Sequence, residues 1–369
     1  MKLDPNVPYN DLPLLPPDCN LDSPEILKKT ISASRALAEL KGLGITIPNQ
    51  SILINSITLQ EARTSSEIEN VITTNDALFK AFAAKTGQID PATKEVLHYR
   101  SALWEGYNTL KTQNLLTTNV FIRLVQTIKQ NNAGVRKTTG THLSNDKTGE
   151  VMYTPPVGES IIRDKLGNLE TFIHTDDGID PLIKLAIMHY QFEAIHPFSD
   201  GNGRTGRILN ILYLVQKNLL DLPVLYLSKY IIEHKSNYYR FLRAVTTKQE
   251  WIPWILFMLD AVEQTANFSR KRILDIRNLM ERTVEKAKNE LPDYMYSKEL
   301  IEILFHQPYC KAQFLVEANL AERKTAATYL KELERIGVLM SRSIGREKLY
   351  LNIKLYELLA DQHVQSMPI

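Results

Sequence analysis

Apolar residues recur at intervals of three and four through most of this sequence, which is the spacing of helices with one buried face. The first such segment covers residues 24–41, where Pro24 takes the first helical position and Gly42 and Gly44 end the helix. Residues 1–24 are rich in proline, which predicts an extended arm laid over the folded body. Seven further segments are predicted to be helical, at residues 75–88, 91–131, 158–173, 180–195, 203–218, 228–245 and 251–289.

Another helix is predicted to run from Thr58 to about Val71. Thr58 and Glu61 have the spacing of a capping box, in which two side chains satisfy backbone N–H groups at the start of a helix. We therefore expect Thr58 to begin this helix.

Residues 134–156 break the helical pattern. Glycine, asparagine and proline are mixed there with threonine, valine and tyrosine. This composition predicts a β-hairpin with its turn between Asn145 and Gly149.

The pattern changes again after Leu291 and Pro292, where we expect a domain boundary. Three helices followed by a strand pair with Gly345 at its turn are predicted, at 298–306, 311–317, 322–336, 338–343 and 347–351. This order is typical of a winged helix, a variant of the helix-turn-helix fold. The expected parts of the chain are residues 1–94, 95–290 and 291–369.

Composition excludes several classes of protein. A net charge of +2 on 44 basic and 42 acidic residues excludes a bulk nucleic-acid binder, although local basic faces remain possible. Cys19 and Cys310 lie far apart and form neither a metal cluster nor a disulfide framework, which favours the reducing cytoplasm. The N-terminus does not read as a signal peptide, and no run of about 18 apolar residues predicts a membrane helix.

Candidate chemistry is concentrated in residues 196–207, His-Pro-Phe-Ser-Asp-Gly-Asn-Gly-Arg-Thr-Gly-Arg. An apolar helix precedes this segment, and Pro197 stops it, which leaves His196 at or beside its C-terminal end. The small residues from Gly201 to Gly203 let backbone N–H groups converge at the start of the next helix. Helix N-termini favour anions, so this segment predicts a phosphate-binding loop.

The charged residues of the segment fit the same interpretation. Arg204 and Arg207 lie three residues apart on one helix face and would add two guanidinium groups to a polyphosphate site. Asp200 would hold Mg²⁺ or Mn²⁺ through one carboxylate while phosphates supply other ligands. His196 is a candidate general base, because a neutral imidazole accepts a proton near pH 7. Each residue alone is more often structural, and the prediction rests on their conjunction.

Glycine spacing in this segment also matches a dinucleotide-binding fingerprint, from Gly201 through Gly203 to Gly206. That fingerprint requires a preceding β-strand, whereas a helix is predicted here. We therefore reject a dinucleotide-binding fold.

Residues 196–207 match the signature of the Fic family, His-x-Phe-x-Asp/Glu-Gly-Asn-Gly-Arg-x-x-Arg, at every specified position. The resemblance covers residues 95–265 and extends to the N-terminal segment and, more loosely, to the tail. It implies a mainly α-helical fold, with a Fic core, a β-hairpin flap and a C-terminal winged helix. It also implies transfer of AMP from ATP to a Tyr, Thr or Ser hydroxyl of a protein target, with the chain itself as a further expected target.

The resemblance also implies roles for individual residues. His196 would deprotonate the incoming hydroxyl, Asp200 would hold the metal ion, and Phe198 would anchor the loop in the core. The hairpin 134–156 would be the flap that positions the target by adding a strand to it. Tyr238 and Tyr239 match a tyrosine pair that lines the adenine pocket in the family. Helix packing is the alternative interpretation of this pair. The implied ATP-binding residues are Glu69, Tyr153, Thr154, Gly201, Asn202, Gly203, Arg204, Thr205, Gly206, Arg207, Tyr238 and Tyr239.

Ser65, Glu69 and Asn70 match the inhibitory motif of Fic proteins, Ser/Thr-x-x-x-Glu-Gly/Asn. Ser65 and Glu69 are four residues apart and share a helix face. The Glu69 carboxylate would pair bidentately with Arg207 and withdraw it from the γ-phosphate, so that ATP binds unproductively.

The tail leaves two alternatives open. Its basic residues would suit DNA phosphates, but glutamates dilute them. Docking of a target, or of a second copy in a homodimer, is the other alternative. The competing function is a nucleotide-sensing, DNA-binding regulator, although the intact His196 and Asp200 favour the enzyme. The basic residues are Arg323, Lys324, Lys331, Arg335, Arg342, Arg346 and Lys348, and the acidic ones Glu322, Glu332, Glu334 and Glu347.

Overall fold

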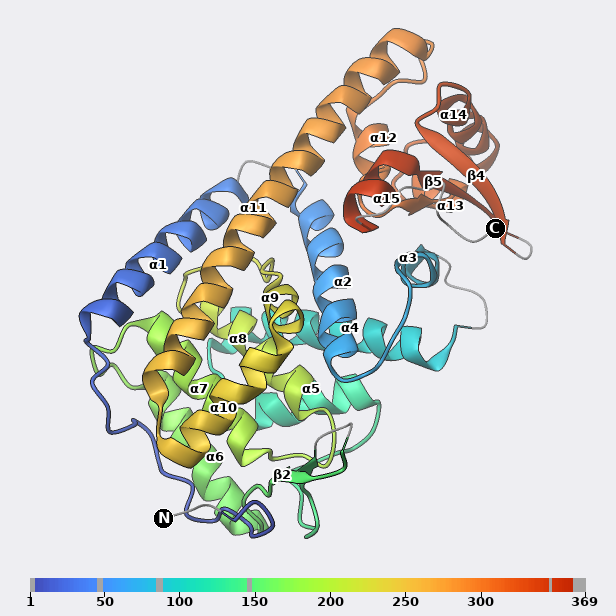
Figure 1. The fold of residues 1–369 in the computed structure, drawn as a ribbon. Coiled ribbons are helices and arrows are strands. Elements are labelled where there is room, and N and C mark those ends of the chain that lie inside the picture. The colour runs from blue at the N-terminus through green and yellow to red at the C-terminus, as the bar shows by residue number, and fades with distance from the viewer. Residues whose placement is uncertain (1–3, 45–48, 84–88, 145–147, 345–346, 361–369) are drawn as a thin grey trace.

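The computed structural model describes residues 4–44, 49–83, 89–144, 148–344 and 347–360, and it confirms the mainly helical fold class (Figure 1). The helices as far as residue 290 are α1 (Pro24–Gly44), α2 (Gln50–Ile68), α3 (Asn75–Ala83), α4 (Pro91–Gln113), α5 (Thr118–Lys129), α6 (Glu159–His174), α7 (Pro181–Ile195), α8 (Asn202–Gln216), α9 (Leu227–Glu233), α10 (Lys235–Lys248) and α11 (Trp251–Glu290). Within the described ranges, every helix is too short or too polar to cross a membrane.

Two segments predicted as single helices are each divided in two. The first breaks at Asn114, whose left-handed backbone ends α4, and Thr117 then caps α5 by accepting a hydrogen bond from the Val120 N–H. The second breaks at His234, which separates α9 from α10. Periodicity missed both breaks because buried apolar residues recur at helical spacing after each of them, from Leu116 to Ile128 and from Tyr238 to Val245. The predicted end of the 75–88 helix lies outside the described residues.

The capping-box prediction for α2 is wrong. The helix begins at Gln50, where the Asn49 side chain accepts a hydrogen bond from the Ser51 N–H. Thr58 lies inside the helix and donates its hydroxyl to the Ile54 carbonyl at 2.5 Å. Glu61 is fully buried and accepts hydrogen bonds from the Ser228 N–H and hydroxyl. Buried isoleucine and leucine side chains before Thr58 extend the helix toward its N-terminus.

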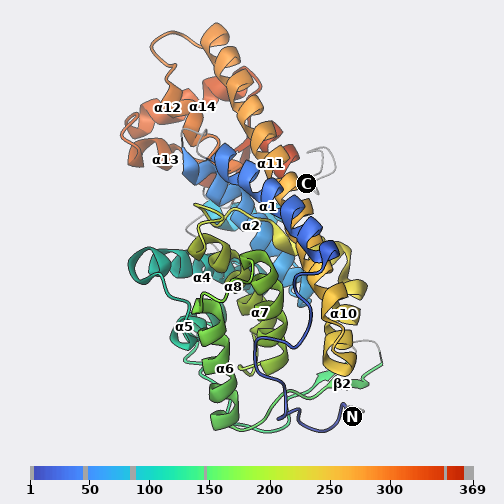
Figure 2. The same ribbon diagram turned by 90° about the vertical axis from the view of Figure 1, so that its left-hand side faces the viewer.

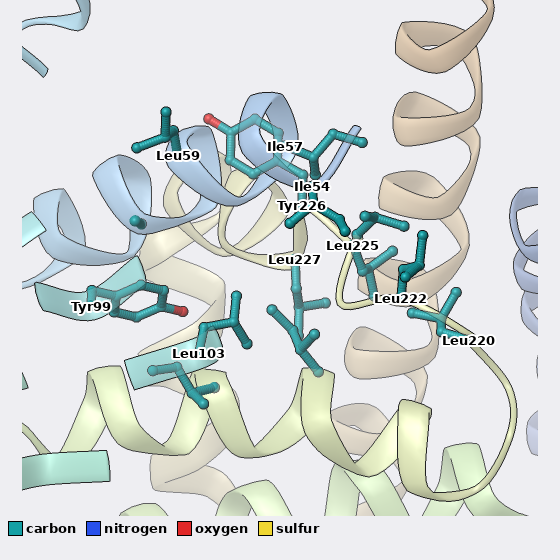
Figure 3. Close-up of a cluster of buried hydrophobic side chains, with 14 of the residues drawn as sticks. Ile54, Ile57, Leu59, Tyr99, Leu103, Leu220, Leu222, Leu225, Tyr226 and Leu227 are labelled. Carbon is teal, nitrogen blue, oxygen red and sulfur yellow. The ribbon is translucent and has the colours of Figure 1, made fainter. Parts of the chain in front are cut away.

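The centre of the molecule is the pair α7 and α8. Helix α7 is buried on almost all of its faces, as expected for a helix apolar all round. It packs against α6, α8 and α11, and α1 lies along α11 (Figures 1 and 2). On the other side of α8, α2 packs on α4 and α9, with apolar side chains between α2, α4 and the segment 220–227 (Figure 3). This packing fixes α2 against the start of α8.

The N-terminal arm lies over the folded body, as predicted. Asn168 of α6 bonds both the N–H and the carbonyl of Leu15, at 2.8 and 3.0 Å. Gln191 of α7 donates to the Pro13 carbonyl at 2.8 Å. Nearer its start, the arm reaches the hairpin, where the Tyr9 N–H donates to the Thr154 carbonyl at 3.0 Å.

The hairpin consists of β1 (Leu143–Ser144) and β2 (Val151–Tyr153), which pair antiparallel with Leu143 opposite Tyr153. Its paired part is therefore short, and longer irregular segments connect it to α5 and α6. Residues 145–147 of the predicted turn lie outside the described residues.

The C-terminal region has the predicted order of three helices and a strand pair. These are α12 (Lys298–Ile303), α13 (Ala312–Glu317), α14 (Arg323–Arg335), β4 (Leu339–Ile344) and β5 (Glu347–Asn352). A short strand, β3 (Tyr309–Cys310), and a last helix, α15 (Ile353–Ala360), were not predicted. The sheet order is β3-β5-β4, with antiparallel pairs. Gly345, the predicted turn residue, lies outside the described residues.

This C-terminal region contacts the start of α2 and the helix α3. The Asn49 side-chain nitrogen lies 2.9 Å from Nε2 of His306. The Tyr309 hydroxyl donates to the Asp76 carboxylate at 2.6 Å. The long helix α11 leads into the region and ends at Glu290, next to the predicted boundary, which stays a prediction.

Candidate active site

His196 stands where α7 ends. Helix α7 starts with Asp180 as its cap and Pro181 in the first turn. At its other end, His196 has a left-handed backbone with φ 49° and donates its N–H to the Phe192 carbonyl at 3.0 Å. Burial, reinforced by the Arg136 charge, lowers the pKa of His196 to about 4. The imidazole is therefore neutral at pH 7, the state that accepts a proton.

The loop between α7 and α8 is closed by its own side chains. Phe198 is buried against Phe192, with the ring centroids 6.3 Å apart, so its predicted packing role is confirmed. The Asn202 side chain accepts a hydrogen bond from the Phe198 N–H and donates one to the Phe198 carbonyl, at 2.8 and 2.7 Å. Gly201 has φ 82°, a conformation that favours glycine. The loop thus delivers the chain to the N-terminus of α8, where backbone N–H groups favour an anion.

Arg207 is buried and bound to the end of α2. Its Nε donates to the Ser65 hydroxyl at 2.7 Å, and its Nη2 donates to the Ser65 carbonyl and to Glu69 Oε1, both at 2.8 Å. The predicted contact between Glu69 and Arg207 is therefore present. It differs in geometry from the expected bidentate pair, because Ser65 takes two of the three hydrogen bonds.

Glu69 carries its negative charge over the start of α8. Burial alone would raise the pKa of Glu69, but Arg207, with Arg204 and His196, holds it below its usual value. A Cβ atom on Gly203 would overlap Glu69 Oε1, so the carboxylate lies directly against this glycine. Glu69 therefore occupies part of the region where the helix N-terminus would receive a phosphate.

Arg204 and Asp200 belong to a second ionic cluster. Arg204 contacts Glu95 of α4 at 2.5 Å and Asp200 at 3.5 Å. Lys129 of α5 contacts the same two carboxylates, at 2.8 and 2.6 Å. Although they lie three residues apart, Arg204 and Arg207 thus have separate sets of partners. Sequence reasoning missed Glu95 and Lys129, because neither belongs to a local motif.

Asp200 fits the role of a single-carboxylate metal ligand. Its side chain is 60 % exposed. Burial would raise the pKa of Asp200, but Lys129 and Arg204 hold it below the usual value, so the group is ionised. The described residues contain no group of three or more metal-ligating side chains, so a divalent ion here would take further oxygens from phosphate and water.

Tyr153 and Thr154 are engaged by the arm and by α7. The Tyr153 hydroxyl donates to the Ala194 carbonyl at 2.8 Å, two residues before His196. The Thr154 hydroxyl donates to the Pro5 carbonyl at 2.6 Å. The structure thus brings Tyr153 against the end of α7, near the candidate base, and Thr154 against the N-terminal arm. Both hydroxyl groups are bound to protein.

The two tyrosines of α10 differ in their surroundings. Tyr238 is buried against Trp254, and its hydroxyl lies 2.8 Å from Nε2 of His189. Tyr239 is 47 % exposed and meets the Tyr238 ring edge to face. Helix packing, the alternative weighed from sequence, therefore describes Tyr238 in this structure.

Thr205 and Gly206 lie near the start of α8 and are buried. A Cβ atom on Gly206 would lie 3.1 Å from Phe192 and would overlap the Glu193 carboxyl group. Gly206 thus allows α8 to approach α7. Burial raises the pKa of Glu193 to about 7, and its Oε1 has no hydrogen-bond partner among the described residues.

Arg136, at the beginning of the hairpin segment, is the largest omission from the sequence-based site. It is 5 % exposed and its Nε donates to the His196 carbonyl at 2.8 Å. A lone arginine in a polar segment carries no signal of such a contact.

Several basic residues of the C-terminal region are paired with the glutamates around them. Arg335 contacts Glu332 at 2.7 Å, and Lys348 contacts Glu334 at 3.7 Å. This pairing reduces the positive charge available to DNA phosphates and does not favour the regulator alternative.

Three family models match the chain. The Fic/DOC family N-terminal model matches residues 27–108, and the Fic/DOC family model matches residues 115–214. A model described as the C-terminal domain of SoFic-like protein adenylyltransferase matches residues 279–355, beginning inside α11.

Similar proteins carry related names. A probable protein adenylyltransferase of Aquifex aeolicus is 37 % identical over 79 residues, 21 % of this chain and 24 % of that protein. Protein adenylyltransferase Fic of Aedes aegypti is 30 % identical over 115 residues, 31 % of this chain and 21 % of that protein. The chain therefore matches about a quarter or less of each of these relatives.

Solved structures agree in fold. A Fic family protein from Desulfovibrio desulfuricans G20 superposes with a TM-score of 0.58 at 17 % identity, covering 92 % of this chain and 98 % of that one. Fic-1 of C. elegans gives a TM-score of 0.52 at 17 % identity, covering 68 % and 73 %.

Proposed function

We propose that this chain, a Fic-domain protein, transfers AMP from ATP to a tyrosine, threonine or serine hydroxyl of a protein target. The observation that carries the proposal is His196, neutral and held at the end of α7, directly before the anion-binding start of α8. The names of the similar proteins support the same activity.

In the proposed reaction, the target hydroxyl oxygen attacks the α-phosphorus of ATP. The new P–O bond forms as the bond to the β-phosphate oxygen breaks, and pyrophosphate leaves. The hydroxyl proton passes to the His196 imidazole and from there to solvent. Bound ATP brings negative charge near His196, which raises the pKa of that imidazole from its low value toward neutrality and makes it a stronger base.

The phosphates are proposed to lie at the start of α8, with Gly201, Asn202 and Gly203 beneath them. Arg204 and Arg207 are proposed to neutralise the outer phosphates. Asp200 would hold Mg²⁺ or Mn²⁺, which when bound would draw negative charge from the phosphate oxygens. Lys129 and Arg204 already keep that carboxylate ionised.

We also propose that Glu69 inhibits the reaction in the folded chain. Arg207 cannot pair fully with a γ-phosphate while Glu69 binds its Nη2. The Glu69 carboxylate also repels the phosphate from the region beside Gly203. ATP would therefore bind with its phosphates displaced from the reactive position.

The cytoplasm is the proposed location, because Cys19 and Cys310 are both free thiols. We propose neither DNA binding nor a homodimer for this chain.

The test is incubation of the purified chain with α-labelled ATP and Mg²⁺, followed by mass spectrometry of the chain and of added cell protein. An AMP adduct on a hydroxyl side chain, with release of pyrophosphate, is expected. A phosphoryl or phosphocholine adduct would exclude the adenylyl reaction while leaving the family assignment intact.

A further inference from the structure

Arg136 joins three segments that are distant in sequence. Its Nε donates to the His196 carbonyl at 2.8 Å, and its Nη2 lies 3.4 Å from the Ile195 carbonyl. The same Nη2 also donates to the carbonyl of Pro156. In addition, the Arg136 backbone N–H donates to the Pro197 carbonyl at 2.9 Å. One buried side chain thus holds the end of α7 and both ends of the hairpin segment 136–156.

The end of α7 requires such support. The left-handed backbone of His196 is unfavourable for a residue with a Cβ atom and persists only where the surroundings impose it. The last carbonyls of a helix also lack partners within the helix. The Arg136 guanidinium supplies donors to these carbonyls, and its positive charge is favourable at a helix C-terminus.

We propose that Arg136 is a positioning residue for AMP transfer: it holds the backbone of His196 in its left-handed conformation and couples the hairpin, where a target would dock, to that histidine. This inference rests on the proposed function, in which His196 is the base.

The charge of Arg136 gives the proposal a second readout. After burial, Arg136 is the main influence that lowers the pKa of His196. The Glu193 backbone carbonyl, Glu69 and Asp200 act in the opposite direction. Loss of the Arg136 charge should therefore raise the pKa of His196. A neutral side chain and a lysine at this position separate charge from geometry, because lysine keeps the charge but lacks the planar fork of donors.

The alternative is that Arg136 only satisfies buried carbonyls and thereby stabilises the fold. A merely structural role predicts that substitution lowers the melting temperature. It also predicts that the rate of AMP transfer by folded molecules is unchanged.

The experiment uses the full chain labelled with ¹³C-histidine, whose His196 signal is identified by its loss in His196→Ala. Titration curves are compared for wild type, Arg136→Gln, Arg136→Lys and Arg163→Gln. Arg163 is the matched control, since its side chain is 50 % exposed and bound to Glu159. Rates of AMP transfer with α-labelled ATP are measured for the same changes placed in Glu69→Gly.

In Arg136→Gln, His196 should titrate at higher pH, whereas Arg136→Lys and Arg163→Gln should titrate like wild type. Both Arg136 variants should lower kcat roughly 10- to 100-fold, the scale of a misplaced catalytic group, with the KM for ATP within about twofold. An unchanged His196 titration in Arg136→Gln, or an unchanged kcat in Arg136→Lys, would overturn the proposal.

If Arg136→Gln does not fold, Arg136→Lys decides the question. In that variant kcat should fall although His196 titrates like wild type. If no variant, the Glu69→Gly parent included, transfers AMP, the proposed function fails. The His196 titration then still tests the placement of Arg136, because it requires no reaction.

Discussion

Replacing Glu69 with glycine should accelerate AMP transfer, because it removes the competitor of ATP for Arg207. Arg207 stays in place in this variant, since Ser65 still accepts two of its hydrogen bonds. The variant therefore releases the guanidinium toward a γ-phosphate without displacing it. Arg207→Ala should be slow, because it removes the group that the phosphate needs.

The size of the effect follows from how far the pair is buried. The Arg207 side chain is 1 % exposed and the Glu69 side chain 35 % exposed. Fully exposed ion pairs contribute about 0.2–1 kcal/mol, and breaking a buried pair costs about 3–5 kcal/mol. Solvent around Glu69 and the Ser65 bonds that remain make this cost smaller. We therefore expect Glu69 to disfavour the pairing of Arg207 with a γ-phosphate by about 1–3 kcal/mol. A coupling of that size corresponds to an increase of roughly 5- to 150-fold in the rate.

The assay is the initial rate of AMP incorporation in wild type, Glu69→Gly, Arg207→Ala and the double variant. The double variant should be as slow as Arg207→Ala. Glu67 provides the matched control, because it lies on the same turn but pairs with Arg63 at 3.1 Å. Glu69→Gln should accelerate transfer and Glu67→Gln should not. Equal rates in wild type, Glu69→Gly and Glu69→Gln would refute the inhibitory role.

Three further predictions concern single residues. His196→Ala should lower AMP transfer at least about 100-fold, the scale of a lost general base, while calorimetry shows ATP still bound; near-normal turnover would exclude the assignment. Asp200→Asn should raise the Mg²⁺ concentration for half-maximal rate, and chelation should stop the wild-type reaction; transfer that persists with chelator would exclude the metal role. The folded-state pKa of Glu193, about 7, lies above its ordinary 4.5, so wild type should lose stability as pH rises through this interval. Glu193→Gln should then be more stable in urea by roughly 1–3 kcal/mol at pH 8 and little changed at pH 4.5, and parallel pH curves would contradict this.

The local part of the site could be predicted from sequence. Pro197 ends α7 and the glycines open α8, so the position of His196 follows from neighbouring residues alone. The capping box failed for the opposite reason. Thr58 and Glu61 have the right spacing, but Ser228 and Tyr99, from distant segments, bind the Glu61 carboxylate in the core. No local pattern distinguishes a capping carboxylate from a buried one.

The wider surroundings of the site depended on tertiary contacts. Glu95 and Lys129 reach the loop from α4 and α5, and Arg136 reaches it from the hairpin segment. None of them belongs to a motif of its own. The resemblance placed Thr154 among the ATP-binding residues, yet it could not foresee that the arm binds its hydroxyl through Pro5.

The helix that carries Glu69 is held along its whole length. Asn49 at its start meets His306, Glu61 in its middle binds Ser228, and Ser65 near its end binds Arg207. A graft of only the short inhibitory motif onto another Fic core would lack the first two of these attachments. Its glutamate would sample many positions and reach the arginine only part of the time. Engineering a switchable enzyme would therefore require transplanting α2 together with the residues that receive it, and the strength of inhibition could be adjusted at Asn49 without altering the residues that bind Arg207.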